Sequence, residues 1–174
     1  YMQQEAGYFI AGGNRDEKLF LWYGPTARNG KSVLANTIAR VLGADKSNGS
    51  GYAKTTPVET FLGSKYGDDG KAAEPNLAGL AGVRLAVASE PERNARLASG
   101  KVKMITGDQQ ITARFLHEDP TTFKTKFKIL ISCNFLPTSD GDASIKRRMN
   151  ITPFDHHIKS GSLEDDPFIM DKLW

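Results

Sequence analysis

The sequence predicts an α/β fold of three layers, in which helices cover a largely parallel central sheet. Residues 18–23 are apolar and aromatic, Gly24 ends the run, and an amphipathic helix follows from Lys31. Two more apolar runs, 83–90 and 123–134, are separated from it by helical or irregular segments. Strands that alternate with helices and share a strand–glycine loop–helix unit are typical of such a sheet. Ligands bind at the carboxyl ends of these strands, where we expect the chemical groups to gather.

Composition narrows the class of protein. A chain of 174 residues fits one domain with a sizeable core, and its net charge of +3 is too small to indicate a nucleic-acid partner by itself. No apolar run is long enough to cross a bilayer and no signal peptide is evident, so we expect a cytoplasmic protein without a membrane role. Cys133 is the only cysteine, which excludes an intrachain disulfide. His156 and His157 are interpreted as surface residues rather than metal ligands.

The remaining elements follow from local patterns. A short helix and a turn are expected before residue 18, and Gly43 should end the helix that starts at Lys31. "TPVE", from Thr56, has the form of a capping box and predicts a further helix start. A helix is expected over residues 95–105, a short helix at "ASIKRRMN" and a last strand at "ITPF". Between them, "ITARFLH" and "TTFKTKFKILISCN" predict a hairpin, with Lys124, Lys126 and Lys128 on one strand face.

The segment "GPTARNGKS" is a candidate phosphate-binding loop. The usual pattern places four residues between its two glycines, whereas Gly24 and Gly30 enclose five. The end that handles phosphate is nevertheless complete, because Lys31 can neutralise phosphate charge and Ser32 can bind Mg²⁺ at a helix N-terminus. A glycine-rich turn that binds nothing is the alternative. The candidate nucleotide-binding residues are Gly24, Asn29, Gly30, Lys31, Ser32 and Val33.

Two polar residues end other predicted strands. Glu90 closes "RLAVASE", where a carboxylate can bind the Mg²⁺ shell or polarise an attacking water. Asn134 closes "KILISCN" and can orient that water. The alternatives are that Glu90 caps the next helical segment and that Asn134 only forms a turn.

In chain order, the motifs are "GPTARNGKS", "RLAVASE", "KMITGDQQITARFLHED", "FKILISCNFLP" and "IKRRMNITPF". This series resembles the superfamily 3 helicases, specifically the C-terminal helicase domain of phage, plasmid and poxvirus primase-helicases. The resemblance extends from about Gly7 to Phe154, and "ITGDQQITARFL" is its most distinctive part because general P-loop ATPases lack it.

The resemblance implies an AAA+-like ATPase that uses ATP and Mg²⁺, assembles as a homo-oligomeric ring, usually a hexamer, and moves on single-stranded DNA. Lys31, Ser32 and Glu90 match the two Walker motifs, and Asn134 matches the sensor asparagine. Arg148 matches the arginine finger, with Arg147 as second choice. Such a finger acts on the nucleotide of a neighbouring subunit. The alternative for "KRR" is a solvated basic helix face.

The family's extra motif covers residues 103–128, and in the family its hairpin contacts DNA in the ring channel. The matching candidates for DNA contact are Arg114, His117, Lys124 and Lys126, although a solvated strand is the alternative for each lysine. Glu118 and Asp119 at the expected tip would repel phosphate.

The expected organisation is a lead-in helix and turn over residues 1–17, a helicase ATPase core over 18–157, and the start of a truncated C-terminal segment over 158–174. The chain begins without an initiator methionine, which suggests a fragment of a longer protein. The resemblance implies a primase domain or primase partner for that longer protein, and a bacterial host cell. The function favoured by the sequence is that of an ATP-dependent DNA helicase core from a mobile-element replication protein. Two alternatives stay open: another P-loop enzyme such as a kinase, and a nucleotide-dependent DNA-binding initiator without helicase activity.

Overall fold

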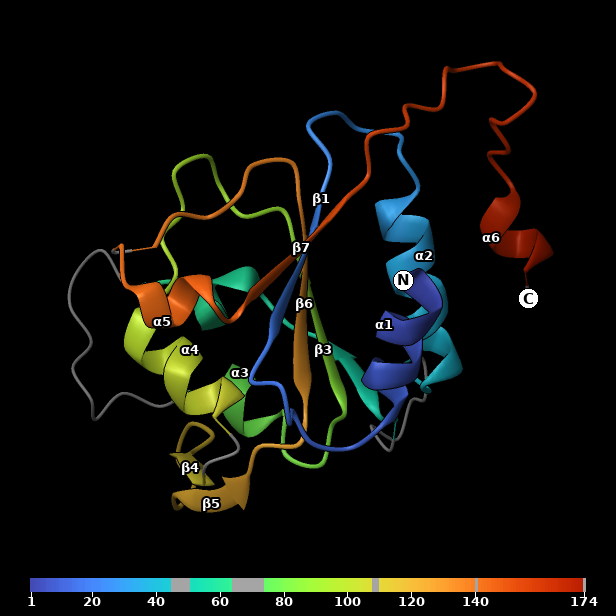
Figure 1. Cartoon of the computed structure of the whole chain (residues 1–174). Helices are drawn as coiled ribbons and strands as arrows, with labels where there is room; N and C mark the ends of the chain where they lie inside the picture. Colours follow the sequence, from blue (N-terminus) through green and yellow to red (C-terminus); the bar gives the residue numbers. More distant parts are fainter. Residues whose placement is uncertain (45–50, 64–73, 108–109, 140, 174) are drawn as a thin grey trace.

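A central sheet of five parallel strands organises the computed structural model (Figure 1), which describes residues 1–44, 51–63, 74–107, 110–139 and 141–173. Its strand order is β2-β3-β6-β1-β7, and each pair of neighbours is parallel. A separate antiparallel hairpin is formed by β4 and β5. The strands are β1 (Leu19–Tyr23), β2 (Ala53–Thr55), β3 (Leu85–Ser89), β4 (Gln110–Ala113), β5 (Thr121–Lys124), β6 (Lys128–Cys133) and β7 (Met149–Pro153). The predicted fold class, including the added hairpin, is therefore confirmed.

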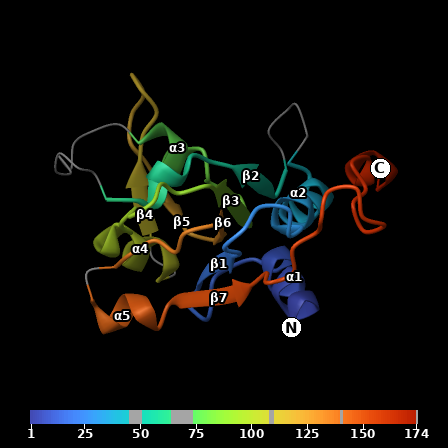
Figure 2. The ribbon, with the colours of Figure 1, turned by 90° about the horizontal axis from the view of Figure 1, so that it is seen from above.

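Helices cover both faces of the sheet, as the view from above shows (Figure 2). One face carries α1 (Met2–Ile10) and α2 (Lys31–Val41). The opposite face carries η1 (Val58–Phe61), α3 (Pro75–Ala78), α4 (Ser99–Thr106) and α5 (Ala143–Lys146). A last short helix, α6 (Ile169–Lys172), lies outside these layers (Figure 1). Within the described part of the chain, no helix is both long and apolar enough to cross a membrane.

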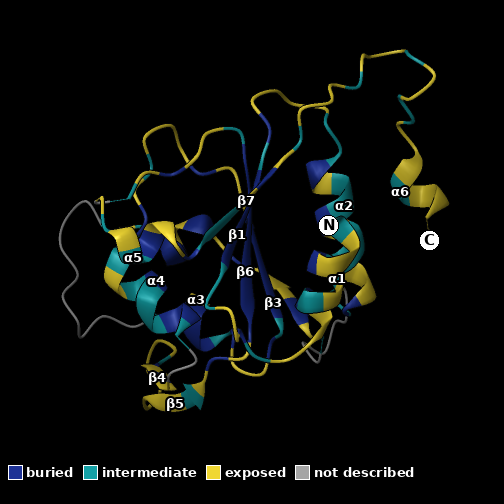
Figure 3. Cartoon of the chain, viewed as in Figure 1, coloured by how far each residue is buried: buried dark blue, intermediate teal, exposed yellow. Residues whose placement is uncertain are grey.

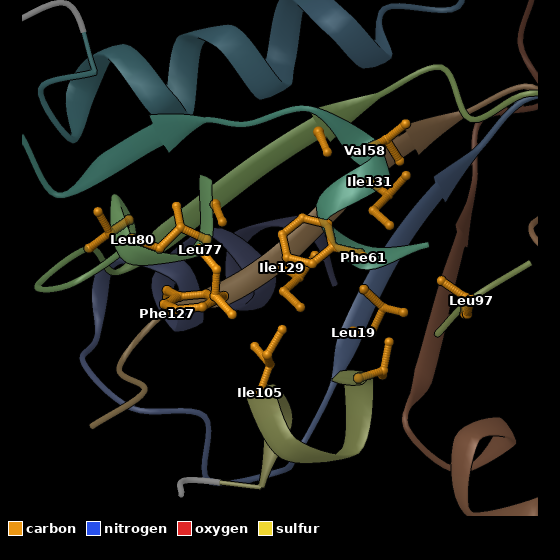
Figure 4. Packing of buried hydrophobic residues seen from close by; sticks show 14 of the residues in the cluster. Leu19, Val58, Phe61, Leu77, Leu80, Leu97, Ile105, Phe127, Ile129 and Ile131 are labelled. Carbon is orange, nitrogen blue, oxygen red and sulfur yellow. The ribbon is translucent and has the colours of Figure 1, made fainter. Parts of the chain in front are cut away.

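The alternation of strand side chains divides the core into two clusters. In β1, Leu19 and Leu21 face the α4 side, where Ile105 packs against them, and Figure 4 shows this cluster. Phe20 and Trp22 face α1 and α2 instead. Since a strand directs successive side chains to opposite faces, a strand covered on both sides must be apolar throughout. The central strands are accordingly buried along their length (Figure 3).

The predicted 123–134 strand is in fact two strands. Residues up to Lys124 pair with β4 in the hairpin, whereas residues from Lys128 pair with β1 and β3 in the central sheet. Lys128 is therefore not on an exposed lysine face as expected. It is fully buried, and its Nζ donates to the carbonyl oxygen of Ala11. Period-2 alternation continues across the bend, so it could not reveal that the pairing partners change.

Two other predicted helices differ from those in the structure. The helix expected over 95–105 begins only at Ser99, and "TPVE" leads into the 3₁₀ turn η1 without a side-chain cap. Gly43 does end α2 as predicted: its φ is 81°, and its N–H donates to the Arg40 carbonyl.

A buried carboxylate attaches α1 to the sheet. Glu5 is 5% exposed and accepts hydrogen bonds from Trp22 Nε1 (2.9 Å), Asn150 Nδ2 (2.7 Å) and Thr152 Oγ1 (2.8 Å). Buried charge is tolerated only when its hydrogen bonds are satisfied. Glu5 thus joins α1 to β1 and β7, the two strands nearest the sheet edge at β7.

We expect Glu5→Ala to lower the free energy of unfolding by about 3 kcal/mol, because three buried donors on β1 and β7 lose their acceptor. Gln4→Ala, on the exposed side of the same helix, is the control and should change it by no more than about 0.5 kcal/mol. Urea unfolding followed by tryptophan fluorescence measures both. Equal stability of the two variants would contradict the anchoring role of Glu5.

Candidate nucleotide site

The carboxyl ends of three neighbouring strands bring the predicted chemical groups to one edge of the sheet. Gly24 follows β1, Asn134 follows β6 and Glu90 follows β3. The ladder continues past the strand ends: the N–H of Gly24 donates to Cys133 O (3.1 Å), and that of Glu90 to Ser132 O (2.9 Å). Neighbouring strands lie about 4.8 Å apart, so Glu90 is about 10 Å across the sheet edge from the phosphate loop.

Three carbonyl groups of the loop from Pro25 to Gly30 accept hydrogen bonds within the protein. Thr26 O accepts from Asn29 Nδ2 at 2.7 Å, and the carbonyls of Ala27 and Arg28 accept from the segment after β7. The N–H groups of residues 26–30 have no acceptor among the described residues. Gly30 has φ 80° and caps α2, a conformation that favours glycine. A loop of unpaired N–H donors leading into a helix N-terminus is suited to an anion.

Lys31, the first residue of α2, directs its ammonium group across this loop. Its Nζ donates to Asn29 Oδ1 (2.8 Å) and Asn134 Oδ1 (3.1 Å) and contacts the Gly24 carbonyl oxygen at 3.4 Å. The residue is 5% exposed, and burial lowers the pKa of its amine. The structure thus brings together the predicted phosphate lysine and the predicted sensor asparagine. Because neutral amide and carbonyl oxygens surround Lys31, its charge is available to an anion.

Gly24 is required by this packing rather than by its backbone conformation. A Cβ atom there would lie 2.0 Å from Asn29 Nδ2, 2.8 Å from Lys31 Nζ and 2.9 Å from the Phe154 carbonyl oxygen. The two side-chain ends can move, but the Phe154 carbonyl belongs to the backbone next to β7. Gly24 therefore allows β1, β7 and the phosphate lysine to meet.

Ser32, Val33 and Glu90 occupy the rim of the site. Ser32 is exposed on the first turn of α2, and the next residue, Val33, is half-buried. Glu90 is exposed and has φ 58°, a conformation that is costly for a residue with a side chain. Such strain is often found at functional sites. Among the described residues, no group of three or more His, Cys, Asp or Glu side chains could hold a metal ion.

Cys133 lies beside Lys31 but offers no chemistry of its own. Burial raises the pKa of its thiol to about 11, although the Lys31 charge acts in the opposite direction. The group is therefore a thiol at neutral pH, and thiols are poor nucleophiles.

Residues 155–165, here called the strap, hold the outer part of the phosphate loop. The N–H of Ile158 donates to Arg28 O (2.8 Å), and His157 Nδ1 contacts Ala27 O at 2.9 Å. The backbone of Arg28 has φ 59°, and its guanidinium pairs with both carboxylate oxygens of Asp165 at 2.5 and 2.6 Å. Sequence patterns did not indicate these contacts, because a lone Arg–Asp pair 137 residues apart carries no periodic signal.

The two finger candidates differ in exposure. Arg148 immediately precedes β7 and is 7% exposed, and its guanidinium donates to Thr106 Oγ1, Ser144 O and Glu17 Oε2. Arg147 also reaches Glu17, at 2.7 Å, but its side chain is 61% exposed. Both lie at the amino end of β7, whereas the phosphate loop of the same chain is at the carboxyl edge. Neither can reach that loop within one chain.

The β4–β5 hairpin and its connection to β6 also lie at the amino edge of the sheet (Figure 1), and the candidate DNA-contact residues belong to this part of the chain. Lys124 ends β5, and Lys126 precedes β6; both are exposed. Arg114 is half-buried after β4, and His117 is exposed in the hairpin turn with φ 63°. The expectation that every chemical group lies at a carboxyl strand end is therefore wrong for two sets of candidates. The hairpin residues come before β6, and Arg147 and Arg148 come before β7. These two sets and the nucleotide-site candidates occupy opposite edges of one sheet.

The chain is similar to proteins named putative helicases and shares its fold with a solved structure. The chain is 33% identical over 147 residues to "Putative helicase L207/L206" of Acanthamoeba polyphaga mimivirus, and 32% over 160 residues to "Putative helicase 022R" of Frog virus 3 (isolate Goorha). These matches cover 83% and 89% of this chain but only 14% and 15% of the relatives. The A form apo structure of the NrS-1 C terminal region shares the fold, with a TM-score of 0.64 and 13% identity over 92% of this chain and 34% of that chain.

The sequence relatives and the shared fold confirm the resemblance to the superfamily 3 helicases, and they define the class of protein as a helicase-type domain. Residues 22–148 match the family described as "Family of unknown function (DUF5906)". The chain belongs to this family.

We expect Gly24→Ala to weaken ATP binding at least 10-fold, because the added methyl group displaces Asn29 and Lys31 and presses on the Phe154 carbonyl. Gly7→Ala is the control: a Cβ there meets nothing within 4 Å, and alanine in a helix adds about 0.5–1 kcal/mol of stability. Isothermal titration with ATP, together with thermal unfolding, compares the two. Unaltered ATP affinity in the Gly24 variant would contradict the role of this glycine.

Proposed function

We propose that this domain is the ATP-hydrolysing motor of a DNA helicase, working at subunit interfaces of a homo-oligomeric ring on single-stranded DNA. The observation that carries the proposal is the phosphate loop, in which the N–H groups of residues 26–30 have no acceptor among the described residues and the Lys31 ammonium contacts Asn134. The helicase relatives support nucleotide use. Because the chain spans about a seventh of those relatives, the activity of the whole protein is part of the proposal.

Each group at the site has a distinct task in this proposal. The loop N–H groups and Lys31 bind the β- and γ-phosphates and stabilise charge that develops on them. Glu90 accepts the proton of the attacking water or polarises it, and Asn134 orients that water. When phosphate binds, the Lys31 ammonium exchanges its neutral partners for an anion.

A Mg²⁺ ion fits the oxygen groups at the rim. The hydroxyl of Ser32 and the carboxylate of Glu90 are both exposed and are ligands that Mg²⁺ accepts. The protein alone supplies too few ligands among its described residues, so phosphate oxygens would complete the shell. When bound, the ion would neutralise phosphate charge.

The arginine finger is assigned to Arg147 rather than to Arg148. A finger must leave its own subunit and contact the neighbour's nucleotide, which suits the exposed Arg147 side chain. Arg148 already has three partners within its chain, and its movement would leave Glu17 and Thr106 without it. We propose that Arg148 instead holds Glu17 and α5 so that Arg147 is presented outward.

The β4–β5 hairpin is proposed to contact DNA through Lys124 and Lys126, with Arg114 and His117 nearer its turn. Their charges suit phosphate contacts that do not depend on base sequence. The relatives belong to viruses, which supports an origin in a mobile genetic element, and we propose a role in the replication of that element. A hexameric ring, a primase domain or partner elsewhere in the protein, and a cytoplasmic site of action in a bacterial host complete the proposal.

ATP hydrolysis should rise cooperatively with protein concentration and rise further with single-stranded DNA, because each site needs a residue from its neighbour. Lys31→Ala should reduce the rate at least 100-fold, whereas Lys159→Ala, an exposed lysine of the strap, should not change it. Steady-state phosphate release measures both.

Turnover proportional to concentration, dependent on a small acceptor and indifferent to DNA would indicate a kinase. Binding of ATP and DNA without hydrolysis, unaffected by Glu90→Gln, would indicate an initiator module.

The two arginines can be separated by mixing variants. Arg147→Ala and Lys31→Ala should each be inactive alone, yet an equal mixture should regain about a quarter of wild-type hydrolysis, since one interface in four combines an intact loop with an intact finger. Arg148→Ala should instead lower the unfolding free energy by about 2 kcal/mol through its buried hydrogen bonds. Full activity of Arg147→Ala by itself would remove the finger assignment.

A further inference from the structure

A cavity lies at the opposite edge of the sheet from the phosphate loop. It has a volume of about 570 Å³ and is lined by the turn before β1, the residues just before β2 and β3, and the β5–β6 connection. Since β1 has five residues, about 16 Å of strand separates this cavity from the nucleotide site. We call it the amino-edge groove.

Four cationic side chains line the groove: Arg15, Arg84, Lys124 and Lys126. The lining includes no carboxylate among the described residues. Within that part of the chain, Arg15, Arg84 and Lys126 also have no carboxylate as an ion-pair partner elsewhere. Surface cations are usually interspersed with acids, so this concentration of one sign favours an anionic ligand.

The walls of the groove are well ordered by internal contacts. The Arg84 guanidinium lies 4.0 Å above the centre of the Tyr52 ring and donates to Ile10 O at 3.0 Å. Asn14, buried in the turn before β1, bonds to the backbone of Lys18 through both ends of its amide. Arg84 uses one of its two terminal nitrogens for Ile10 and keeps further N–H donors for a ligand.

A fifth cation lies beside one residue of the groove lining, because the N–H of Lys128 donates to the carbonyl oxygen of Arg84 at 2.9 Å. Lys128 is fully buried, its Nζ lies 4.8 Å from the centre of the Tyr8 ring, and it donates to Ala11 O. Burial and then the charge of Arg84 lower the pKa of Lys128 to about 8. An anion above Arg84 would relieve this repulsion.

We infer that the amino-edge groove is a binding site for the sugar–phosphate backbone of single-stranded nucleic acid, continuing the hairpin's contact surface to Arg15 and Arg84. The inference rests on the proposed function for the class of ligand and adds a path beyond the hairpin. Lys124 and Lys126 belong to both surfaces, so a strand that contacts the hairpin is carried into the groove. The Tyr52 ring and the Arg84 guanidinium above it would provide a stacking surface beside the phosphates, as is common for single strands.

The test uses two double variants. The groove variant combines Arg15→Gln and Arg84→Gln. The control combines Arg40→Gln and Lys159→Gln, which removes the same charge from exposed positions elsewhere. Binding of a fluorescent 20-nucleotide single strand is measured by anisotropy from about 0.05 to 0.3 M salt. Two lost phosphate contacts should reduce the slope of log K against log salt by about 1.4 and weaken binding roughly 25-fold at 0.1 M salt. The control should match the wild type.

Arg15→Gln alone provides a second measurement that does not disturb the Tyr52 contact. Its side chain is exposed, so the variant should fold normally and lose about 0.7 of the slope, or about 5-fold in affinity. ATP hydrolysis without DNA should be unchanged in both groove variants, because neither residue belongs to the nucleotide site.

The possible failures are distinguishable. Wild-type protein that does not bind the strand would contradict the proposed DNA function and the groove together. Wild-type binding with the groove variants behaving like the control would overturn the groove alone. The groove would also be overturned if orthophosphate or polyglutamate displaced the fluorescent strand and an unlabelled single strand at equal charge concentration did not. That result would indicate a free-phosphate or acidic-peptide site.

Discussion

Parallel pairing of β1 between β6 and β7 is the constraint on which the rest of the structure depends. The register joins Tyr23 to Cys133 on one side and to Pro153 on the other, so all three strands end at the same level. The residues that follow them, Gly24, Asn134 and Phe154, must therefore meet around the Lys31 ammonium. Antiparallel pairing would send one of these residues to the opposite edge. The burial of β1 on both faces fixes this register, because a slip of one residue would exchange the side chains of its two core clusters.

The same sheet makes β6 a direct connection between the two edges. Asn134 follows its last residue and contacts the phosphate lysine, whereas Lys126 lies two residues before its first and lines the amino-edge groove. A six-residue strand spans about 20 Å and is stiff when its neighbours are bonded on both sides. Movement of Asn134 on loss of the γ-phosphate would therefore be transmitted along β6 rather than absorbed by a loop. In the proposed motor, this strand would couple hydrolysis to movement of bound DNA.

The elements that the sequence predicted well are those with a local cause. The buried β1, the Gly24 break, the α2 stripe and Gly43 each depend on neighbouring residues, and the structure has all of them. Features that depend on distant partners were missed. The 123–134 run alternates without a break although its pairing partner changes, and Lys128 is buried by Tyr8 from another segment. Arg15 and Arg84 gather in one groove only because both precede parallel strands of the sheet. Arg148 matched a family position, but only packing reveals its burial.

The extra residue of the phosphate loop has a physical explanation in the strap. The carbonyls of Ala27 and Arg28 are bonded to His157 and Ile158, and the Arg28 side chain is held by Asp165. The additional length thus lies on the outside of the loop, away from Gly30 and Lys31. These bonds occupy the carbonyls, whereas the N–H groups of residues 26–30 have no acceptor among the described residues and are available to phosphate oxygens. The strap therefore preorganises a loop that would otherwise lose conformational entropy when an anion binds, and this lowers the cost of binding.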